Sequence, residues 1–312
     1  MKPKLSVCLI TYNHEKYLQQ CIESIIAQKC NEPFEIIIGE DNSTDNTPAI
    51  VASYQQKYPK LISVIVSEKN VGMVENWRRT IEAARGEYIA IVEGDDFWNS
   101  DLKLQQQIDL MDVEKECALS FHDVDVIFGD GVPKIDSLTR FEGESKFSIQ
   151  DVITRNWFVP TCSMVIRKIC LSDFPDWTKN LKAIDMVVQL LAASNGGIHY
   201  INEKLATYRI HDTGQSQIQW LGKENIFEFT IIDILQNFDN YSNGKYRDYV
   251  HQRLERAYRS LLAKNLPWSK HYLKAMAGLV KLNPKKNGSI IKDWLITNFI
   301  PTHLYKIYRA IK

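Results

Sequence analysis

Two clusters of acidic side chains occur where apolar segments of the chain end. Glu40–Asp45 follows one such segment, and Glu93, Asp95 and Asp96 follow another. If the segments are neighbouring parallel strands, these carboxylates share one edge of a sheet, where a divalent cation or donors on a ligand would relieve their repulsion. Ordinary turn formation explains either cluster alone, because Asp, Asn and Ser favour turns.

The elements that would position these groups alternate between strands and helices. We expect strands at 5–11, 34–38, 61–66 and 88–92, each followed by a helix, at 17–28, from Pro48, at 73–84 and at 102–113. Thr47 would cap the second helix, with Pro48 at its first position. Four successive units of this kind predict a mostly parallel α/β sheet with helices on both faces. Ligands of such sheets bind beyond the carboxyl ends of the strands.

The alternation weakens after Val113. Strands are expected at 117–128, 161–167 and 198–209, with a helix at 185–193. From about Gln219 the apolar spacing is helical throughout. We therefore expect a sheet domain over 1–216, with halves at 1–98 and 99–216, and a helical region over 217–312.

Composition favours a globular protein of one large or two modest domains. The chain has 312 residues, 45% of them hydrophobic and 24% charged. No segment is apolar for long enough to cross a membrane, and the start lacks the pattern of a signal peptide. The six cysteines form no C-x-x-C pair and are expected to be buried thiols. These features predict a cytoplasmic protein.

Several motifs, in order, resemble those of the inverting nucleotide-sugar glycosyltransferases of family 2, which share the glycosyltransferase A fold. The resemblance covers roughly residues 4–216. The matching segments are Ser6–Asn13, Glu35–Thr47, Asn70–Gly72, Arg85–Val92, Glu93–Trp98, Ala183–Asp185 and Tyr208–His211. The chain departs from the family pattern at three positions. Glu40 and Glu93 stand where Asp is usual, and Ile184 stands where an acid is often found. Glu93 occupies the position that usually faces the ribose.

The resemblance implies a nucleotide-sugar site and a metal. The implied metal ligands are Asp95 and His211, holding Mn²⁺ or Mg²⁺ against the diphosphate, with Arg209 available to pair with phosphate. The nucleotide-sugar contacts it implies are Thr11, Tyr12, Asn13, Asp41, Asn70, Gly72, Asn76, Glu93 and Asp95.

Asp185 is the general base that the resemblance implies. A single displacement needs a carboxylate that takes the proton of the acceptor hydroxyl as its oxygen attacks. The alternative is that Asp185 only caps the helix that it opens. Of the tryptophans, Trp98 is the best candidate for stacking on a sugar, and a half-buried pair with satisfied hydrogen bonds is the better interpretation of His122–Asp123.

The C-terminal part of the chain is basic. Residues 241–312 hold fifteen Lys and Arg against three acidic residues, and apolar residues of 290–312 fall near one helical stripe. This pattern favours contact with an anionic membrane surface, with packing on the sheet domain as the alternative. No nucleic-acid recognition motif accompanies the charge, so a nucleic-acid partner is not expected.

Together these features predict a metal-dependent inverting glycosyltransferase that moves a sugar from a nucleoside diphosphate, most simply UDP, to a hydroxyl of a glycan or lipid-linked oligosaccharide in surface polysaccharide biosynthesis. The alternative from another class is a catalytically silent scaffold that binds nucleotide-sugar or glycan at the inner face of the cytoplasmic membrane. A nucleotidylyltransferase is disfavoured, because residues 1–33 contain no glycine for a phosphate loop.

Overall fold

The computed structural model describes residues 2–129, 132–135, 141, 143–172, 174–181, 183–212, 214 and 225–282. The chain divides into two compact units, Met1–Ile218 and Gln219–Lys312, which we describe separately. The first is a mixed α/β unit and the second is helical where it is described.

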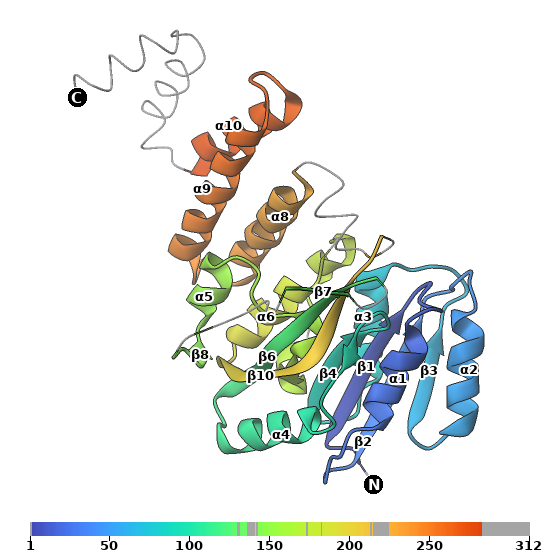
Figure 1. Cartoon of the computed structure of the whole chain (residues 1–312). Coiled ribbons are helices and arrows are strands. Elements are labelled where there is room, and N and C mark those ends of the chain that lie inside the picture. The colour runs from blue at the N-terminus through green and yellow to red at the C-terminus, as the bar shows by residue number, and fades with distance from the viewer. Residues whose placement is uncertain are drawn as a thin grey trace, which may run out of the picture. The chain divides into compact units, whose positions relative to one another are not determined.

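The first unit opens with the four strand–helix pairs that the sequence predicts (Figure 1). Their strands run parallel in the order β3-β2-β1-β4. The elements are β1 (Leu5–Thr11), α1 (Leu18–Ile26), β2 (Phe34–Glu40), α2 (Thr47–Lys57), β3 (Ile62–Val66), α3 (Met73–Ala83) and β4 (Tyr88–Glu93). In the sheet register Thr11 pairs with Glu40, and Ile10 pairs with Glu93. The carboxyl ends of β1, β2 and β4 are therefore level.

The sheet continues through β9, β6, β10 and β5, and here its direction changes. β9 is antiparallel to both β4 and β6, whereas β6 and β10 are parallel. The elements are β5 (Phe97–Trp98), α4 (Lys103–Val113), β6 (Cys117–Phe128), β7 (Val132–Ile135), β8 (Lys146–Phe147), α5 (Ile149–Thr154), β9 (Val165–Arg167), α6 (Asp185–Ala193) and β10 (Gly197–Ile210), with short 3₁₀ helices at Thr161–Ser163, Lys168–Leu171 and Asp176–Asn180. The mixed second half on the same sheet is as predicted.

Two local predictions are wrong. The expected strand at 161–167 begins instead as a 3₁₀ turn, and only Val165–Arg167 pairs with neighbours. Thr47 does not cap α2: Asp45 Oδ1 accepts the Thr47 N–H at 2.9 Å, while Thr47 Oγ1 accepts the N–H of His14 at 2.9 Å. Thr47 thereby ties the start of α2 to the loop that follows β1.

The core explains why these strands form. Every residue of β1 is buried, and the buried face of α1 presents Leu18, Cys21, Ile22 and Ile25 to it. Burying a side chain of this size contributes roughly 1.5–3 kcal/mol. All six cysteines are free thiols, five of them buried, as expected.

The second unit contains three described helices: α8 (Ile226–Tyr241), α9 (Arg247–Lys264) and α10 (Lys270–Leu282). Their helical structure follows the predicted apolar spacing, and each helix buries an apolar face. The predicted amphipathic segment 290–312 lies outside the described residues. Among the residues that are described, no helix has the length and apolar character needed to cross a bilayer.

The turn before β4 is held by a buried carboxylate. Glu35 Oε1 accepts the hydroxyl of Ser6 at 2.7 Å and the backbone N–H of Arg85 at 2.9 Å, and the Arg85 guanidinium pairs with Oε2. Burial opposes ionisation, but the bonds from Arg85 and Ser6 outweigh it and lower the pKa of Glu35. The ionised carboxylate therefore joins β1, β2 and the start of β4.

We predict that Glu35→Gln lowers the free energy of unfolding by about 2 kcal/mol at pH 7, because charge-assisted hydrogen bonds are lost from a buried site. Because the pKa of Glu35 is lower in the folded protein than in the unfolded chain, the ionised carboxylate stabilises the fold at pH values above the unfolded pKa. Protonation removes this contribution, so the difference in free energy of unfolding between Glu35→Gln and wild type should shrink below about pH 4. Denaturant unfolding at pH 7 and below about pH 4 measures the free energy of unfolding of both proteins. The control is Glu87→Gln, at a half-exposed glutamate, which should cost less than about 1 kcal/mol. A deficit independent of pH would contradict this account.

Candidate active site

The acidic turn after β4 packs tightly on the end of β1. An added Cβ at Gly94 would lie 2.8 Å from Thr11 Oγ1 and 2.8 Å from His14 Nδ1. No side chain is accommodated there without displacing those atoms. Gly94 therefore brings Asp95 against the loop that follows Thr11.

Asp95 is the centre of a cluster with two histidines. Its Oδ2 lies 3.0 Å from Nε2 of His211 and 3.8 Å from Nε2 of His14. The ring of Tyr17 packs on His211, with the ring centroids 4.8 Å apart. Burial opposes ionisation of Asp95, but the charge of His14 and the hydrogen bond with His211 outweigh burial and lower its pKa. The side chain keeps 17% exposure, so the ionised oxygen remains accessible.

Asp95 and His211 lie on elements far apart in the sequence. Asp95 follows β4, whereas His211 follows β10, and the structure brings the two predicted metal ligands together. Two adjacent ligands of an octahedral ion with bonds of about 2.1 Å are about 3 Å apart. A carboxylate oxygen and an imidazole nitrogen at 3.0 Å therefore fit Mn²⁺ or Mg²⁺.

His14 is a site residue that the sequence analysis missed. Among the described residues its Nδ1 has no hydrogen-bond partner, although the atom is buried. The signal for it was present: His14 comes directly after Thr11-Tyr12-Asn13 at the carboxyl end of a predicted strand. What could not be read from the sequence was the turn that points the ring at Asp95.

The neighbouring acids Glu93 and Asp96 have raised pKa values. Burial, and then the charges of Asp96 and Asp95, raise the pKa of Glu93 well above its ordinary value. Burial and Asp95 raise the pKa of Asp96 likewise. Asp96 is 2% exposed, and its Oδ1 accepts the backbone N–H of Arg209 at 2.8 Å. Asp96 therefore fastens the acidic turn to β10, while Glu93 and Asp95 stay near the surface.

Arg209 has a different role from the phosphate contact that we expected. Its Nε donates to the carbonyl of Asp95 at 3.0 Å, and its two terminal nitrogens donate to Gly129 O and Gln20 Oε1, each at 2.8 Å. The side chain is buried, with the guanidinium over the ring of Tyr17. Through the bond to the Asp95 carbonyl, Arg209 stabilises the backbone at that residue.

The predicted base-binding residues form one wall. Asp41 is buried, and its two oxygens accept the backbone N–H groups of Val71 at 2.8 Å and Gly72 at 2.9 Å. Gly72 has φ = 87°, which favours glycine, and Asn70 beside it is exposed. Asp41 thus fixes the loop that carries Asn70 and Gly72.

The loop after β1 lies next to the loop after β2. Tyr12 is 40% exposed. Asn13, at φ = 55°, donates its backbone N–H to Ser43 Oγ at 3.0 Å and accepts the N–H of Thr44 on its side-chain oxygen at 2.8 Å. Thr11 is buried, and its carbonyl accepts the N–H of Asp41 at 3.1 Å. These bonds join the loops after β1 and β2 and leave Tyr12 on the surface.

Asn76 does not fit the nucleotide contact that we expected. It is 2% exposed; its amide donates to the carbonyl of Gly39 at 2.8 Å, and its oxygen accepts from Nε of Arg79 at 2.8 Å. The residue packs α3 against β2. Trp98 is also wrong as a sugar platform, because it is 4% exposed and its indole N–H donates to Cys162 O at 3.1 Å.

Asp185 begins α6 and faces the acidic turn. Its charge is among the causes that raise the pKa of Glu93. Burial raises the pKa of Asp185 itself, although the indole N–H of Trp157 donates to its Oδ2 at 2.8 Å and opposes that shift. A partly exposed carboxyl group with a raised pKa suits proton transfer near neutral pH. Trp157, missed by the sequence analysis in this role, fixes its orientation.

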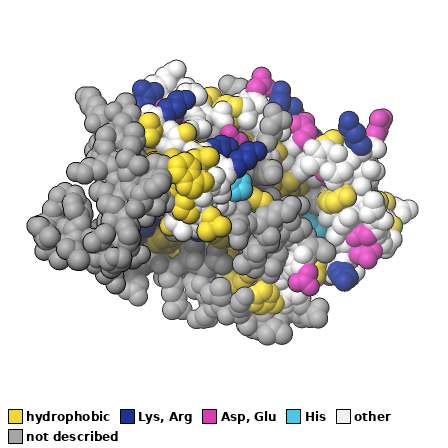
Figure 2. Space-filling model, turned by 90° about the horizontal axis from the view of Figure 1, so that it is seen from above, with side chains coloured by type: hydrophobic (Ala, Val, Ile, Leu, Met, Phe, Trp, Pro, Cys, Tyr) yellow, Lys and Arg dark blue, Asp and Glu magenta, His cyan; other side chains and the backbone are white. Residues whose placement is uncertain are grey.

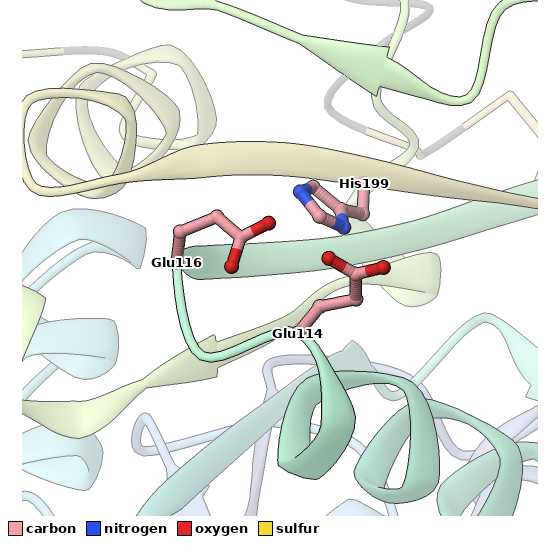
Figure 3. A group of neighbouring side chains, drawn as sticks. All are labelled: Glu114, Glu116 and His199. Carbon is pink, nitrogen blue, oxygen red and sulfur yellow. The ribbon is translucent and has the colours of Figure 1, made fainter.

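Two other polar groups in the first unit are structural. His122 is fully buried, not half-buried as expected; its Nδ1 lies 2.7 Å from the carbonyl of Asp123, and its Nε2 has no hydrogen-bond partner among the described residues. Glu114, Glu116 and His199 face one another near the amino ends of β6 and β10 (Figure 3). The amine of Lys146 lies 2.8 Å from Glu114 and 3.4 Å from Glu116, so a cation of the chain already balances these carboxylates.

Comparisons with known proteins identify a family and a fold for this chain. The sequence pattern of the family described as glycosyl transferase family 2 matches residues 6–170. The uncharacterized protein Rv1520 of Mycobacterium tuberculosis is 35% identical over 67% of this chain, and the match spans 60% of that protein's length. The putative teichuronic acid biosynthesis glycosyltransferase TuaG of Bacillus subtilis is 29% identical over 70% of this chain and 84% of its own.

Among solved structures, the fold resembles that of residues 1–349 of S. aureus TarS in complex with UDP. The TM-score is 0.64 at 21% identity, over 92% of this chain and 83% of that one. The similarity confirms the expected α/β fold, with its sheet flanked by helices. On the strength of the family pattern, which spans more than half of its length, the chain belongs to glycosyl transferase family 2.

Proposed function

We propose that the protein is a metal-dependent inverting glycosyltransferase. It transfers a sugar from a nucleoside diphosphate, UDP for preference, to a hydroxyl of a glycan or lipid-linked oligosaccharide. The observation that carries the proposal is the Asp95–His211 pair, 3.0 Å apart, together with Asp185, a carboxyl group with a raised pKa whose charge acts on Glu93 of the same acidic turn. A group that binds a phosphate-bridging cation and a general base beside it are the two parts that a single displacement needs.

The nucleotide would lie between the loops after β1 and β2 and the loop at 70–72. Tyr12 offers an exposed ring to the base, and the tight loop at Gly72 leaves room for close approach of the backbone. Asn70 is the candidate polar contact of the base, and Glu93 is the candidate for the ribose. Asp41, which we expected to contact the base, is buried with both oxygens bonded to Val71 and Gly72, so it would instead hold this loop in position. The likeness to TarS, solved in complex with UDP, supports UDP as the nucleotide.

Asp95 and His211, with His14 behind them, would hold the divalent cation. When bound, such a cation offsets the charge that develops on the departing diphosphate. The lowered pKa of Asp95 keeps the carboxylate ionised for this role at neutral pH. The positions of Gly94 and Arg209 hold the carboxylate in place before substrate arrives.

Asp185 would remove the proton of the acceptor hydroxyl. The oxygen then attacks the anomeric carbon from the face opposite the nucleotide, the bond from that carbon to the diphosphate breaks, and the configuration inverts. Trp157 donates a hydrogen bond to Oδ2 of the carboxyl group and so fixes its orientation.

The acceptor is proposed from relatives and from charge. TuaG is named for teichuronic acid biosynthesis, which supports a surface polysaccharide. A cytoplasmic enzyme with a lipid-linked acceptor would work at the inner face of the cytoplasmic membrane, and the basic segment 290–312 remains a candidate contact with anionic lipid. A silent scaffold would bind the same donor without turnover.

Asp95→Asn should lower metal-dependent UDP release from UDP-sugars by a factor on the order of 10²–10³, because it removes a charged ligand from the proposed cation site. The assay follows UDP release with Mn²⁺ and with EDTA. Asp101→Asn, at a half-exposed acid outside the site, is the matched control and should keep wild-type rates. Turnover that resists both EDTA and Asp95→Asn would refute metal dependence.

Asp185→Asn should lower transfer to acceptor by roughly 10²- to 10⁴-fold, the usual contribution of a positioned base, and should leave the Kd for UDP within twofold. Transfer rates and calorimetric UDP titrations separate the two effects. The control is Asp176→Asn, at an acid that is 87% exposed. Equal losses of UDP binding and transfer would show a structural role instead.

Trp157→Phe should move the acidic limb of the kcat/KM profile to higher pH. Removing the indole donor takes away a bond that favours ionised Asp185, so its pKa rises further and the base is lost at a higher pH. Activity on the alkaline side should approach that of wild type. Trp177→Phe serves as control. A uniform loss at every pH would mean that Trp157 only supports the fold.

A further inference from the structure

The turn between α9 and α10 exposes large apolar side chains. Leu266 is 81% exposed and Trp268 is 58% exposed, with Pro267 exposed between them. Trp268 has φ = 70°, a conformation that residues other than glycine rarely adopt. Adjacent exposed apolar residues of this size commonly mark a binding surface. We call residues 266–268 the apolar turn.

The surroundings of the apolar turn are basic. Residues 256–282 contain six Lys and Arg and no Asp or Glu. On α10 the exposed face carries Lys270, Lys274 and Lys281, with Leu273 46% exposed beside them. The opposite face buries Tyr272, Ala275 and Leu279 inside the helical unit. One face of α10 thus holds the fold together, and the other presents amines and a leucine next to the apolar turn.

We propose that the apolar turn and the exposed face of α10 dock on an anionic membrane surface. Leucine and tryptophan side chains enter the boundary between headgroups and acyl chains, where tryptophan is favoured. Lys270 and Lys274 reach the anionic headgroups, with their alkyl chains along the apolar layer. Figure 2 shows a face of the molecule on which hydrophobic side chains gather beside Lys and Arg side chains.

Lipid fits this surface better than other anionic partners. A nucleic acid would match the lysines but offers no aliphatic layer to cover a leucine that is 81% exposed. A bilayer satisfies both parts, because its headgroups are anionic and its interior is apolar. The inference does not rest on the proposed reaction, since vesicle binding is measured without donor or acceptor.

The test is cosedimentation of the full chain with vesicles of phosphatidylcholine alone or with 30% phosphatidylglycerol. Wild type should bind the anionic vesicles, and Leu266→Ser/Trp268→Ser should bind at least tenfold more weakly. The matched control is Val113→Ser/Ile169→Ser, because these side chains of the first unit are 79% and 74% exposed. The control should bind within twofold of wild type. Matching thermal melts for all three proteins show that they are folded.

Lys270→Gln/Lys274→Gln separates the charge contribution. Each basic residue near an anionic surface is worth roughly a fivefold change in partitioning, so this variant should bind about 25-fold more weakly and with less dependence on salt. Three results would overturn the proposal. The first is vesicle binding that the variants of the turn leave unchanged. The second is an equal loss of binding in the Val113/Ile169 control. The third is a change in the oligomeric state of the Leu266/Trp268 variant without lipid, which would make the turn a contact between copies.

Discussion

Mutual repulsion among carboxyl groups is the constraint around which the sheet domain is built. Glu93, Asp95, Asp96 and Asp185 interact closely enough for their charges to shift one another's titration. The chain relieves this repulsion unequally. Burial and neighbouring charges raise the pKa of Glu93 and of Asp96, whereas His14 and His211 lower that of Asp95. Of these three carboxyl groups, Asp95 is therefore the one whose ionised form the surroundings favour.

The contacts around the acidic turn support this difference between Asp95 and its neighbours. Gly94 permits the approach of the acidic turn to β1, Asp96 anchors the turn to the backbone of β10, and Arg209 braces its carbonyl from below. A buried arginine bonded to main-chain oxygens adds positive charge near Asp95 without occupying the exposed side of the carboxylate. The strand order matters here, because β4 and β10 are separated by β9 and β6 in the sheet. The turn after β4 reaches β10 through the short strand β5, which pairs with β10, and through these side-chain contacts.

Much of the fold could be predicted because it follows from local apolar patterns. The bounds of β1, β6 and α6 agree with the expected ranges, and the family motifs lead to Asp95, His211 and Asp185. The failures depend on contacts between distant segments. Nothing local distinguishes Thr47 as a cap from Thr47 as an acceptor for His14, and Asn76 and Trp98 look exposed until α3 and β5 are packed.

The central claim is that Asp95 and His211 hold a divalent cation against the diphosphate of a nucleotide. Anomalous diffraction at the manganese edge, from crystals grown with UDP and Mn²⁺, tests it most directly. The account predicts one peak within bonding distance of both Asp95 Oδ2 and His211 Nε2, at the phosphates of UDP bound between Tyr12 and the loop at 70–72. Bound UDP with no manganese peak near these atoms, or a peak held by other residues, would contradict it.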